Sequence, residues 1–433
     1  YSGWLRFPSL YFGSDPAGLQ NESQLALMSR FSLVGWGWEQ GTGPFCHNSW
    51  SHQPDYRTDH FYNEETRLVE SATRFRAYLS WGPPSRAENA TELLAKPVFV
   101  YRNFVMALHF YDIQRAAYAR PELFLRGSSG EVCLQDVNGS PFWNFSHPET
   151  RAFFLDEMVT SAAREAGSNL VFFDSNDAFY CNLVDSASDY AGPSGGSSCP
   201  ELRYSAGQLR AMYSDVVDVL RATAEILNAA GKAPIYSMVN SFGPAGEGFI
   251  PSAHGPAGCV SAYADVVEAL SNTSWMRYYD GWLQSVKGQD PAAVVTGTQL
   301  LPALLEETKR GVPVIVHADP RVFASHSMEQ GRRGDRSAVA AQSVAVGGDQ
   351  KKPKMPKKPC DNPKDGEGRA SPTLMEAQAA AFLLAQGEYS YFGFSTGWTD
   401  PKWLWWDEYY GFSCGRPHAA ASLSADGRVV AVT

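Results

Sequence analysis

The chain has 433 residues, of which 44% are hydrophobic, 13% aromatic and 19% charged. This composition supplies a large apolar core and excludes a mainly disordered chain, because disorder goes with low hydrophobicity and high net charge. Acidic residues outnumber basic ones by 46 to 36, which argues against a nucleic-acid partner, and no apolar run is long enough to predict a membrane span.

Short runs of β-branched and aromatic residues alternate along the chain with longer segments of helical periodicity. The runs predict strands at 8–15, 32–39, 97–104, 169–174, 233–240, 275–280, 312–319 and 389–396. The longer segments predict helices at 21–31, 63–79, 147–166, 206–230, 261–270, 300–310 and 373–386. Eight strand-then-helix units predict an α/β fold, a (β/α)8 TIM barrel. A doubly wound sheet would also alternate, but no glycine-rich phosphate loop follows the first strand.

The predicted barrel occupies residues 1–412 and carries one unusual insertion, at 331–370. This insertion holds ten basic against five acidic residues and is centred on KKPKMPKKP, so its net charge is +5. Pro-Lys alternation favours an extended solvated loop. A second interpretation is an electrostatic contact with an anionic glycan or with a neighbouring subunit during self-assembly. Residues 413–433, ending in the strand-like RVVAVT, are expected to begin a small C-terminal β module.

Five asparagines begin an Asn-X-Ser/Thr acceptor for N-linked glycans: Asn21, Asn89, Asn138, Asn144 and Asn272. This number exceeds the chance expectation and predicts a secreted, extracellular glycoprotein, with an accidental cluster in a cytosolic protein as the alternative. The chain begins at Tyr1 without a signal-peptide pattern, as expected of a processed or truncated secreted protein.

The seven cysteines form no CxxC pair and no cysteine-histidine cluster with zinc-finger spacing. In an oxidising compartment they allow disulfides and leave one thiol over. Cys181 and Cys199 flank a short loop rich in glycine and serine and are the first predicted pair. The sequence leaves the other pairings open.

Carboxylates recur at the carboxyl ends of the predicted strands, where a (β/α)8 barrel builds its active site. Asp174 ends the apolar strand NLVFFD, and Asp280 ends WMRYYD on the opposite side of the expected barrel mouth. Two such carboxylates can act on one glycosidic bond, with Asp174 as nucleophile or stabiliser and Asp280 as general acid/base. The structural alternatives are a helix cap for Asp174 and a turn residue for Asp280.

Further polar and aromatic residues at the strand ends are predicted to bind substrate, since flat rings stack on the C–H faces of sugars. They are Glu39, Trp36, Trp38, Arg102, Asn240, His317, Asp319 and Trp398. The alternative for the aromatic residues is a place in the core. His317 and Asp319 lie two apart on one strand but have no third ligand at a recognisable spacing, so neither a metal nor another cofactor is expected.

Three segments carry a resemblance to known proteins: NFSHPETRAFFLDEMV, NLVFFDSND and YSYFGFSTGWTDPKWLWWDEYYGFSCGRP. Together they resemble glycoside hydrolase-like barrel proteins, especially the group called glycosyl hydrolase-like family fifteen, over residues 97–433. The resemblance implies a barrel and a carbohydrate substrate. The pair Asp174 and Asp280 also resembles the α-galactosidase clan, whose nucleophile ends strand four and whose acid/base ends strand six.

One departure from the sequence pattern of that clan leaves open whether the protein is catalytically active. The chain has Phe172-Phe173-Asp174 where the clan has Lys-x-Asp. The predicted function is therefore a secreted, metal-independent glycoside hydrolase-like protein that acts on or binds carbohydrate. The alternative is a non-catalytic structural or lectin-like subunit of an extracellular wall, sheath or filament.

Overall fold

Eight parallel strands form one sheet and lie in it in the order of the chain. The computed structural model describes residues 9–13, 18–37, 40, 64–81, 95–108, 111–127, 130–133, 140–174, 206–237, 265–266, 268–270, 272–280, 300–318, 321–322, 369–370, 376, 378–380, 382–383, 386–387, 389–394, 422–423 and 429–430. The strands are β1 (Leu10–Gly13), β2 (Leu33–Trp36), β3 (Val98–Asn103), β4 (Leu170–Asp174), β5 (Ala233–Ser237), β6 (Arg277–Asp280), β7 (Val314–Ala318) and β10 (Ser390–Phe394). Every neighbouring pair is parallel, and each strand falls within a predicted run.

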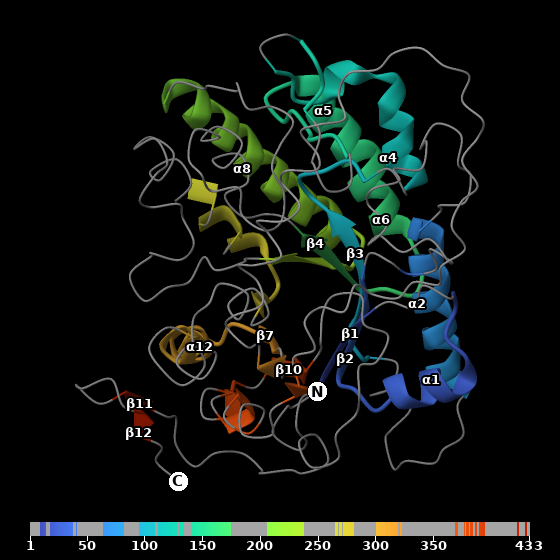
Figure 1. The fold of residues 1–433 in the computed structure, drawn as a ribbon, viewed down its shortest axis with the longest axis vertical. Coiled ribbons are helices and arrows are strands. Elements are labelled where there is room, and N and C mark those ends of the chain that lie inside the picture. Colours follow the sequence, from blue (N-terminus) through green and yellow to red (C-terminus); the bar gives the residue numbers. More distant parts are fainter. Residues whose placement is uncertain are drawn as a thin grey trace, which may run out of the picture.

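Helices connect the strands and lie outside them (Figure 1). They include α1 (Glu22–Met28), α2 (Glu64–Trp81), α4 (Asp112–Ala116), α5 (Pro148–Phe153), α6 (Thr160–Arg164), α8 (Ala206–Ala229) and α12 (Leu300–Lys309). Short 3-10 turns η2 (Ala117–Ala119) and η3 (Pro121–Leu123) follow α4. Gly231 and Gly311 directly follow the predicted helices 206–230 and 300–310. They lie just beyond α8 and α12 with φ of 72° each, a conformation that favours glycine.

The helix predicted at 147–166 is confirmed, with one irregularity. A π-helical turn η4 (Phe154–Val159) separates α5 from α6. Pro148 stands in the first turn of α5, where its missing N–H leaves no hydrogen bond unmade. The hydroxyl of Thr160 donates to the carbonyl of Leu155, five residues earlier, at 2.9 Å. This wider turn is compatible with burial of Phe154 against the sheet.

The sheet is strongly curved. In a flat sheet β1 and β4 would lie about 14 Å apart, since neighbouring strands are about 4.8 Å apart. The rings of Phe12 on β1 and Phe172 on β4 nevertheless lie 5.0 Å apart between centroids. Phe12 also lies 6.3 Å from the ring of His317 on β7. Ser9, next to β1, forms a parallel bridge with Phe392 of β10, so the first and last strands meet.

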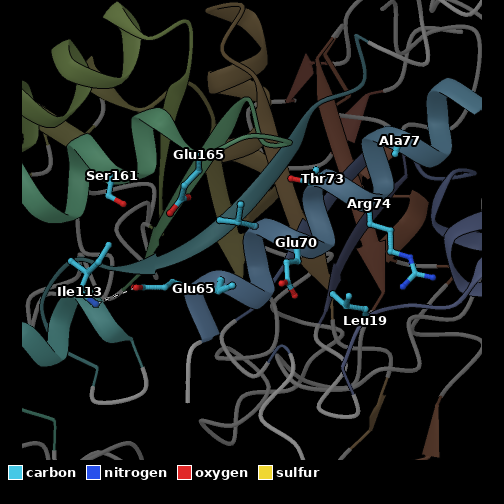
Figure 2. A pocket seen from close by; sticks show the side chains of 11 residues that line it. Leu19, Glu65, Glu70, Thr73, Arg74, Ala77, Ile113, Ser161 and Glu165 are labelled. Atoms are coloured by element: carbon cyan, nitrogen blue, oxygen red, sulfur yellow. Dashed lines mark hydrogen bonds between the residues drawn. The ribbon is translucent and has the colours of Figure 1, made fainter. Parts of the chain in front are cut away.

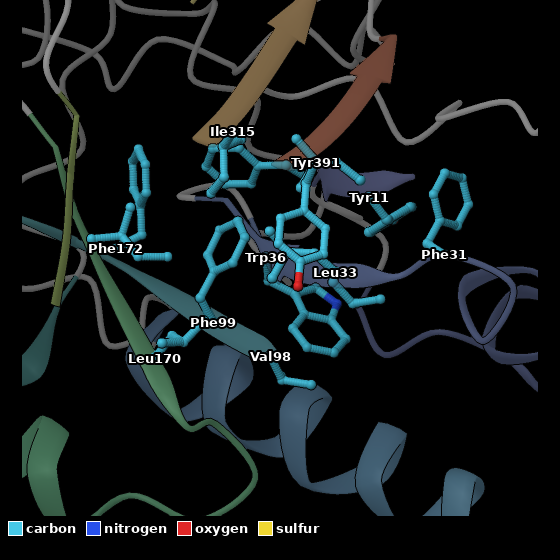
Figure 3. Packing of buried hydrophobic residues seen from close by; sticks show 14 of the residues in the cluster. Tyr11, Phe31, Leu33, Trp36, Val98, Phe99, Leu170, Phe172, Ile315 and Tyr391 are labelled. Atoms are coloured by element: carbon cyan, nitrogen blue, oxygen red, sulfur yellow. The ribbon is translucent and has the colours of Figure 1, made fainter. Parts of the chain in front are cut away.

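Curvature encloses an apolar core to which most strands contribute. Figure 3 shows Leu33, Phe99, Phe172, Ile315 and Tyr391 in one cluster, with one residue each from β2, β3, β4, β7 and β10. All five are buried. Each large side chain removed from water in this way contributes about 1.5 to 3 kcal/mol to stability. The apolar runs that predict the strands therefore reflect burial on both faces.

Gly35 in β2 has a packing reason to be glycine. A Cβ at this position would lie 2.0 Å from the ring of Phe99. We expect Gly35→Ala to lower the free energy of unfolding by about 2 kcal/mol, because the ring must move within a filled core. Urea denaturation measures the loss. Adding Phe99→Leu should reduce it, and an equal loss in both backgrounds would contradict the packing explanation.

Two short antiparallel pairs lie apart from the main sheet. β8 (Arg321–Val322) pairs with β9 (Arg369–Ala370), so the two sides of the basic insertion come together. Residues 331–368 of the insertion lie outside the described residues. β11 (Ser422–Leu423) pairs with β12 (Val429–Val430), which includes part of the predicted last strand. Among the described helices, none is long and apolar enough to cross a membrane.

Candidate functional site

Polar residues meet at the carboxyl ends of β3 and β4. Asp174, the last residue of β4, is in register with Asn103, the last residue of β3. Asp174 is partly exposed, whereas Tyr101 and Asn103 are 2% and 1% exposed. The ring of Tyr101 lies 6.1 Å from Phe172, which belongs to the inner aromatic core. The carboxyl group therefore lies at the inner edge of the sheet, between the buried core and solvent.

Hydrogen bonds hold this carboxyl group from below. The hydroxyl of Tyr101 donates to Oδ2 of Asp174 at 2.9 Å. Nδ2 of Asn103 donates to the hydroxyl oxygen of Tyr101 at 3.1 Å. Burial, and then the charge of Asp174, raises the pKa of Tyr101 well above its usual value, so the phenol keeps its proton. Asp174 thus faces a permanent hydrogen-bond donor.

The turn after β3 is fixed to the same group. Oδ1 of Asn103 accepts hydrogen bonds from the backbone N–H groups of Val105 and Met106, at 3.0 and 2.8 Å. The N–H of Phe104 donates to the carbonyl of Asp174 at 3.0 Å. Asn103 therefore links the backbone of the turn after β3 to the hydroxyl of Tyr101, which in turn contacts Asp174 of β4.

Asp280, the second predicted catalytic residue, ends β6 and is in register with His317 of β7. The backbone of Asp280 is described, but its side chain is not. Its place in the sheet, two strands beyond β4, agrees with the predicted end of strand six. A shared pocket with Asp174 stays a prediction.

His317 is completely buried on the inner face beside Phe12. Burial lowers its pKa from 6.5 to about 3, so the imidazole is neutral at pH 7. The predicted contact with substrate would require this ring to lie at the barrel mouth. In the structure, the ring is packed in the core on the inner face of the sheet. Contact with substrate stays untested.

The pKa of His317 predicts a pH dependence of stability. The unfolded chain binds this proton below about pH 6.5 and the folded chain only below about pH 3, so stability falls as the pH drops between these values. The contribution is at most about 1.4 kcal/mol per pH unit. The free energy of unfolding, measured with urea at pH 7, 6, 5 and 4, should decline less steeply for His317→Gln than for the wild-type protein. Equal slopes for the two proteins would contradict the prediction.

Arg102 and Trp36, both predicted to bind substrate, lie on the outer face of the sheet. A guanidinium nitrogen of Arg102 forms an ion pair with Glu165, and another donates to the carbonyl of Tyr101 at 2.7 Å. The ring of Trp36 packs on Phe75 of α2, with centroids 5.8 Å apart. Alternation along a strand accounts for this placement, because positions next to inward-facing residues face outward. A role of Arg102 and Trp36 in substrate binding stays a prediction.

Several predicted residues lie outside the described part of the chain. They are Glu39, Trp38, Asn240, Asp319 and Trp398 for substrate, Cys181 and Cys199 for the disulfide, and Asn89 and Asn138 for glycans. Their roles stay predictions. Among the described residues, no group of three or more His, Cys, Asp or Glu side chains could hold a metal ion.

Tyr101 is the residue that the sequence prediction missed. It stands one position before Arg102 and shares a strand face with Phe99 and Asn103 (β3, VFVYRN). Because side chains alternate between the two faces of a strand, either Arg102 or the pair Tyr101 and Asn103 can face the mouth, but not all three. This alternation offers Tyr101 as a candidate whenever Asn103 faces the mouth.

A separate pocket of about 580 Å³ lies in the helix layer (Figure 2). Its lining comes from α2, α4 and the end of α6, together with Leu19: Glu65, Thr66, Val69, Glu70, Thr73, Arg74, Ala77, Ile113, Ser161 and Glu165. Figure 2 shows Oε1 of Glu65 accepting from the backbone N–H of Ile113, at 3.1 Å. Of the predicted catalytic and substrate-binding residues whose side chains the structure describes, none lines this pocket.

Comparisons with known proteins leave the family open. No protein-family model matches the chain, and no curated protein is detectably similar in sequence. Similar solved structures include Aspergillus fumigatus Ega3 in complex with galactosamine, with 11% identity, 77% of this chain and 88% of that chain covered and a TM-score of 0.34. The noncanonic maltogenic α-amylase AmyB of Thermotoga neapolitana has 12% identity, with 72% of this chain and 60% of that chain covered and a TM-score of 0.37.

A third similar structure is an old yellow enzyme homologue from Zymomonas mobilis, with 12% identity, 76% and 81% coverage and a TM-score of 0.33. For all three structures the identity is 12% or less and the TM-score is below 0.5, so these similarities do not establish a function. The resemblance to glycosyl hydrolase-like family fifteen stays a prediction.

Proposed function

We propose that the sheet closes into a (β/α)8 barrel. Three observations support closure. The eight strands follow the order of the chain, Ser9 bridges to Phe392 of the last strand, and Phe12 of β1 reaches Phe172 of β4. The residues at the carboxyl ends of the strands would then surround one mouth.

We propose that this mouth is a glycoside hydrolase-type site that acts on carbohydrate. The observation that carries the proposal is the Asp174 carboxyl group, partly exposed at the inner edge of the sheet and bonded to the Tyr101 hydroxyl. A carboxylate held there can attack the anomeric carbon or stabilise an oxocarbenium-like transition state. Asp280, at the end of β6, is the proposed general acid/base.

The distance between the two carboxyl groups would decide the stereochemistry. About 5 Å favours a covalent intermediate and retention, and about 6.5 to 9.5 Å leaves room for a water molecule and favours inversion. A screen against aryl glycosides and polysaccharides tests the function itself. Hydrolysis of at least one substrate by the wild-type protein, and not by Asp174→Asn, is the expected result.

A non-catalytic carbohydrate-binding or structural subunit is the second candidate. Phe172, which stands in place of the lysine of the α-galactosidase clan, is completely buried in the ring cluster with Phe12 and Phe99. The lack of a lysine charge at position 172 favours this candidate. Binding of an oligosaccharide without hydrolysis, measured by calorimetry, would support it.

We propose further that the protein is secreted and N-glycosylated. Asn21 and Asn272 are exposed, and Asn144 is partly buried. Asn21 caps α1 through Oδ1, which accepts from the N–H of Gln24 at 3.0 Å and leaves Nδ2 for a glycan. Cys133 is disulfide-bonded, and the six other cysteines all lie outside the described residues. Peptide mapping after enzymatic removal of glycans tests occupancy.

A further inference from the structure

A chain of hydrogen bonds runs from the turn after β3 to the Asp174 carboxyl group. We propose that Tyr101 and Asn103 are positioning residues that hold Asp174 in one orientation and in its charged form. This inference rests on the proposed function, since it gives Asp174 the role of nucleophile or stabiliser and leaves that of acid to another group. Neither tyrosine nor asparagine would touch the reacting sugar in this arrangement.

The orientation of the Asn103 amide is fixed by its backbone partners. Its Oδ1 accepts from two N–H groups, those of Val105 and Met106. An amide turned the other way would bring Nδ2 against these two donors. Nδ2 therefore points to Tyr101 and donates to the hydroxyl oxygen.

This donation determines where the Tyr101 proton lies. A phenol carries a single hydrogen, and the lone pair that faces Asn103 is already an acceptor. The hydrogen is directed to Oδ2 of Asp174, 2.9 Å away. A donor that cannot itself ionise in the working pH range favours the charged form of the carboxyl group it contacts. Asp174 is then suited to attack or to stabilise positive charge, rather than to donate a proton.

Among the described residues, Arg102 and Tyr111 lie near Tyr101 on the outer side of the sheet, and His317 lies on its inner face. Arg102, on the neighbouring position of β3, faces outward to Glu165 and lies over the ring of Tyr111, 5.5 Å from its centroid. The hydroxyl of Tyr111 lies 3.4 Å from the Tyr101 carbonyl, on that outer side. His317 lies on β7, three strands from Asp174, and is neutral at pH 7. Tyr101, by contrast, donates directly to the carboxyl group of Asp174, across 2.9 Å.

The test compares Tyr101→Phe with Tyr236→Phe. Both remove a buried phenol hydroxyl, but that of Tyr236 donates to the carbonyl of Leu220 in the helix layer, at 3.2 Å. The carboxyl resonance of Asp174 is followed through a pH titration of protein with ¹³C-labelled aspartate. The carboxyl resonance of Asp174 is assigned as the signal that is missing from the spectrum of Asp174→Asn. We expect the titration midpoint of Asp174 to move to higher pH in Tyr101→Phe and to stay in place in Tyr236→Phe.

Kinetics supply the second readout once a substrate is known. Tyr101→Phe should lower kcat by about tenfold with little change in KM, and should move the acidic limb of the pH–rate profile to higher pH. Asn103→Asp is the second variant, in case Tyr101→Phe does not fold. It replaces the donor to Tyr101 by an acceptor, which draws the phenol proton away from Asp174 and moves the midpoint in the same direction.

The outcomes separate the two proposals. An unchanged midpoint in folded Tyr101→Phe or Asn103→Asp overturns the positioning role, even where Asp174→Asn abolishes hydrolysis. A shifted midpoint supports the positioning role and does not depend on activity. If no substrate is hydrolysed while the midpoint shifts, the proposed function alone fails.

Discussion

Asp174→Asn is expected to reduce kcat/KM for glycoside hydrolysis by about 10³-fold or more. The amide has no negative charge with which to attack the anomeric carbon or to stabilise the transition state. Its oxygen can still accept the hydrogen bond from Tyr101, which spans 2.9 Å in the wild-type protein. The fold should therefore persist, and the loss should be confined to catalysis. Steady-state kinetics measure the first effect and thermal melting followed by circular dichroism the second.

Asp218→Asn is a matched control for the same chemical change. Asp218 lies on α8 with its side chain 70% exposed, so its neutralisation should leave both kcat/KM and the melting temperature unchanged. Sodium azide adds a second control. In Asp174→Ala, azide can replace a missing nucleophile, and formation of a glycosyl azide with inverted anomeric configuration would assign Asp174 that role rather than that of a base. An unchanged rate in Asp174→Asn would exclude Asp174 from catalysis.

The strands could be predicted from the sequence because both of their faces are buried. β4 and β7, for example, consist almost entirely of buried residues and stand out as apolar runs. The ends of α8 and α12 could be predicted because Gly231 and Gly311 adopt a backbone conformation that favours glycine. The main elements of the described fold therefore follow from local signals.

The same burial hides which way each side chain faces. A strand that is apolar on both sides has no polar alternation to fix its phase, so Arg102 looks as suited to the mouth as Asn103. Packing decides the phase: Gly35 of β2 makes room for Phe99, which turns Tyr101 and Asn103 to the inner face and Arg102 outward. Such contacts join residues 64 positions apart and leave no local trace in the sequence.

The ion pair between Glu165 and Arg102 could not be predicted from the sequence either. It follows α6 and pairs with Arg102, 63 positions earlier, in an arrangement that depends on how α6 docks on the sheet. Burial alone would lower the pKa of Arg102, but the charge of Glu165 raises it, and the net pKa lies above its usual value. The guanidinium is therefore charged in the folded protein, with 1% of its side chain exposed.

Arg102→Met is expected to lower the free energy of unfolding by about 3 kcal/mol, because it leaves the largely buried carboxylate of Glu165 without its cation. Urea denaturation measures this loss. The double variant Arg102→Met, Glu165→Met removes both charges and should recover most of the stability, since apolar side chains of similar volume can replace a buried ion pair.

Catalysis should be little changed in the double variant, because Arg102 faces away from Asp174. A double variant that folds as poorly as Arg102→Met would show that packing, rather than the charge left behind, accounts for the loss. A large fall in kcat/KM in a stable double variant would instead return Arg102 to the substrate site that the sequence alone predicts for it.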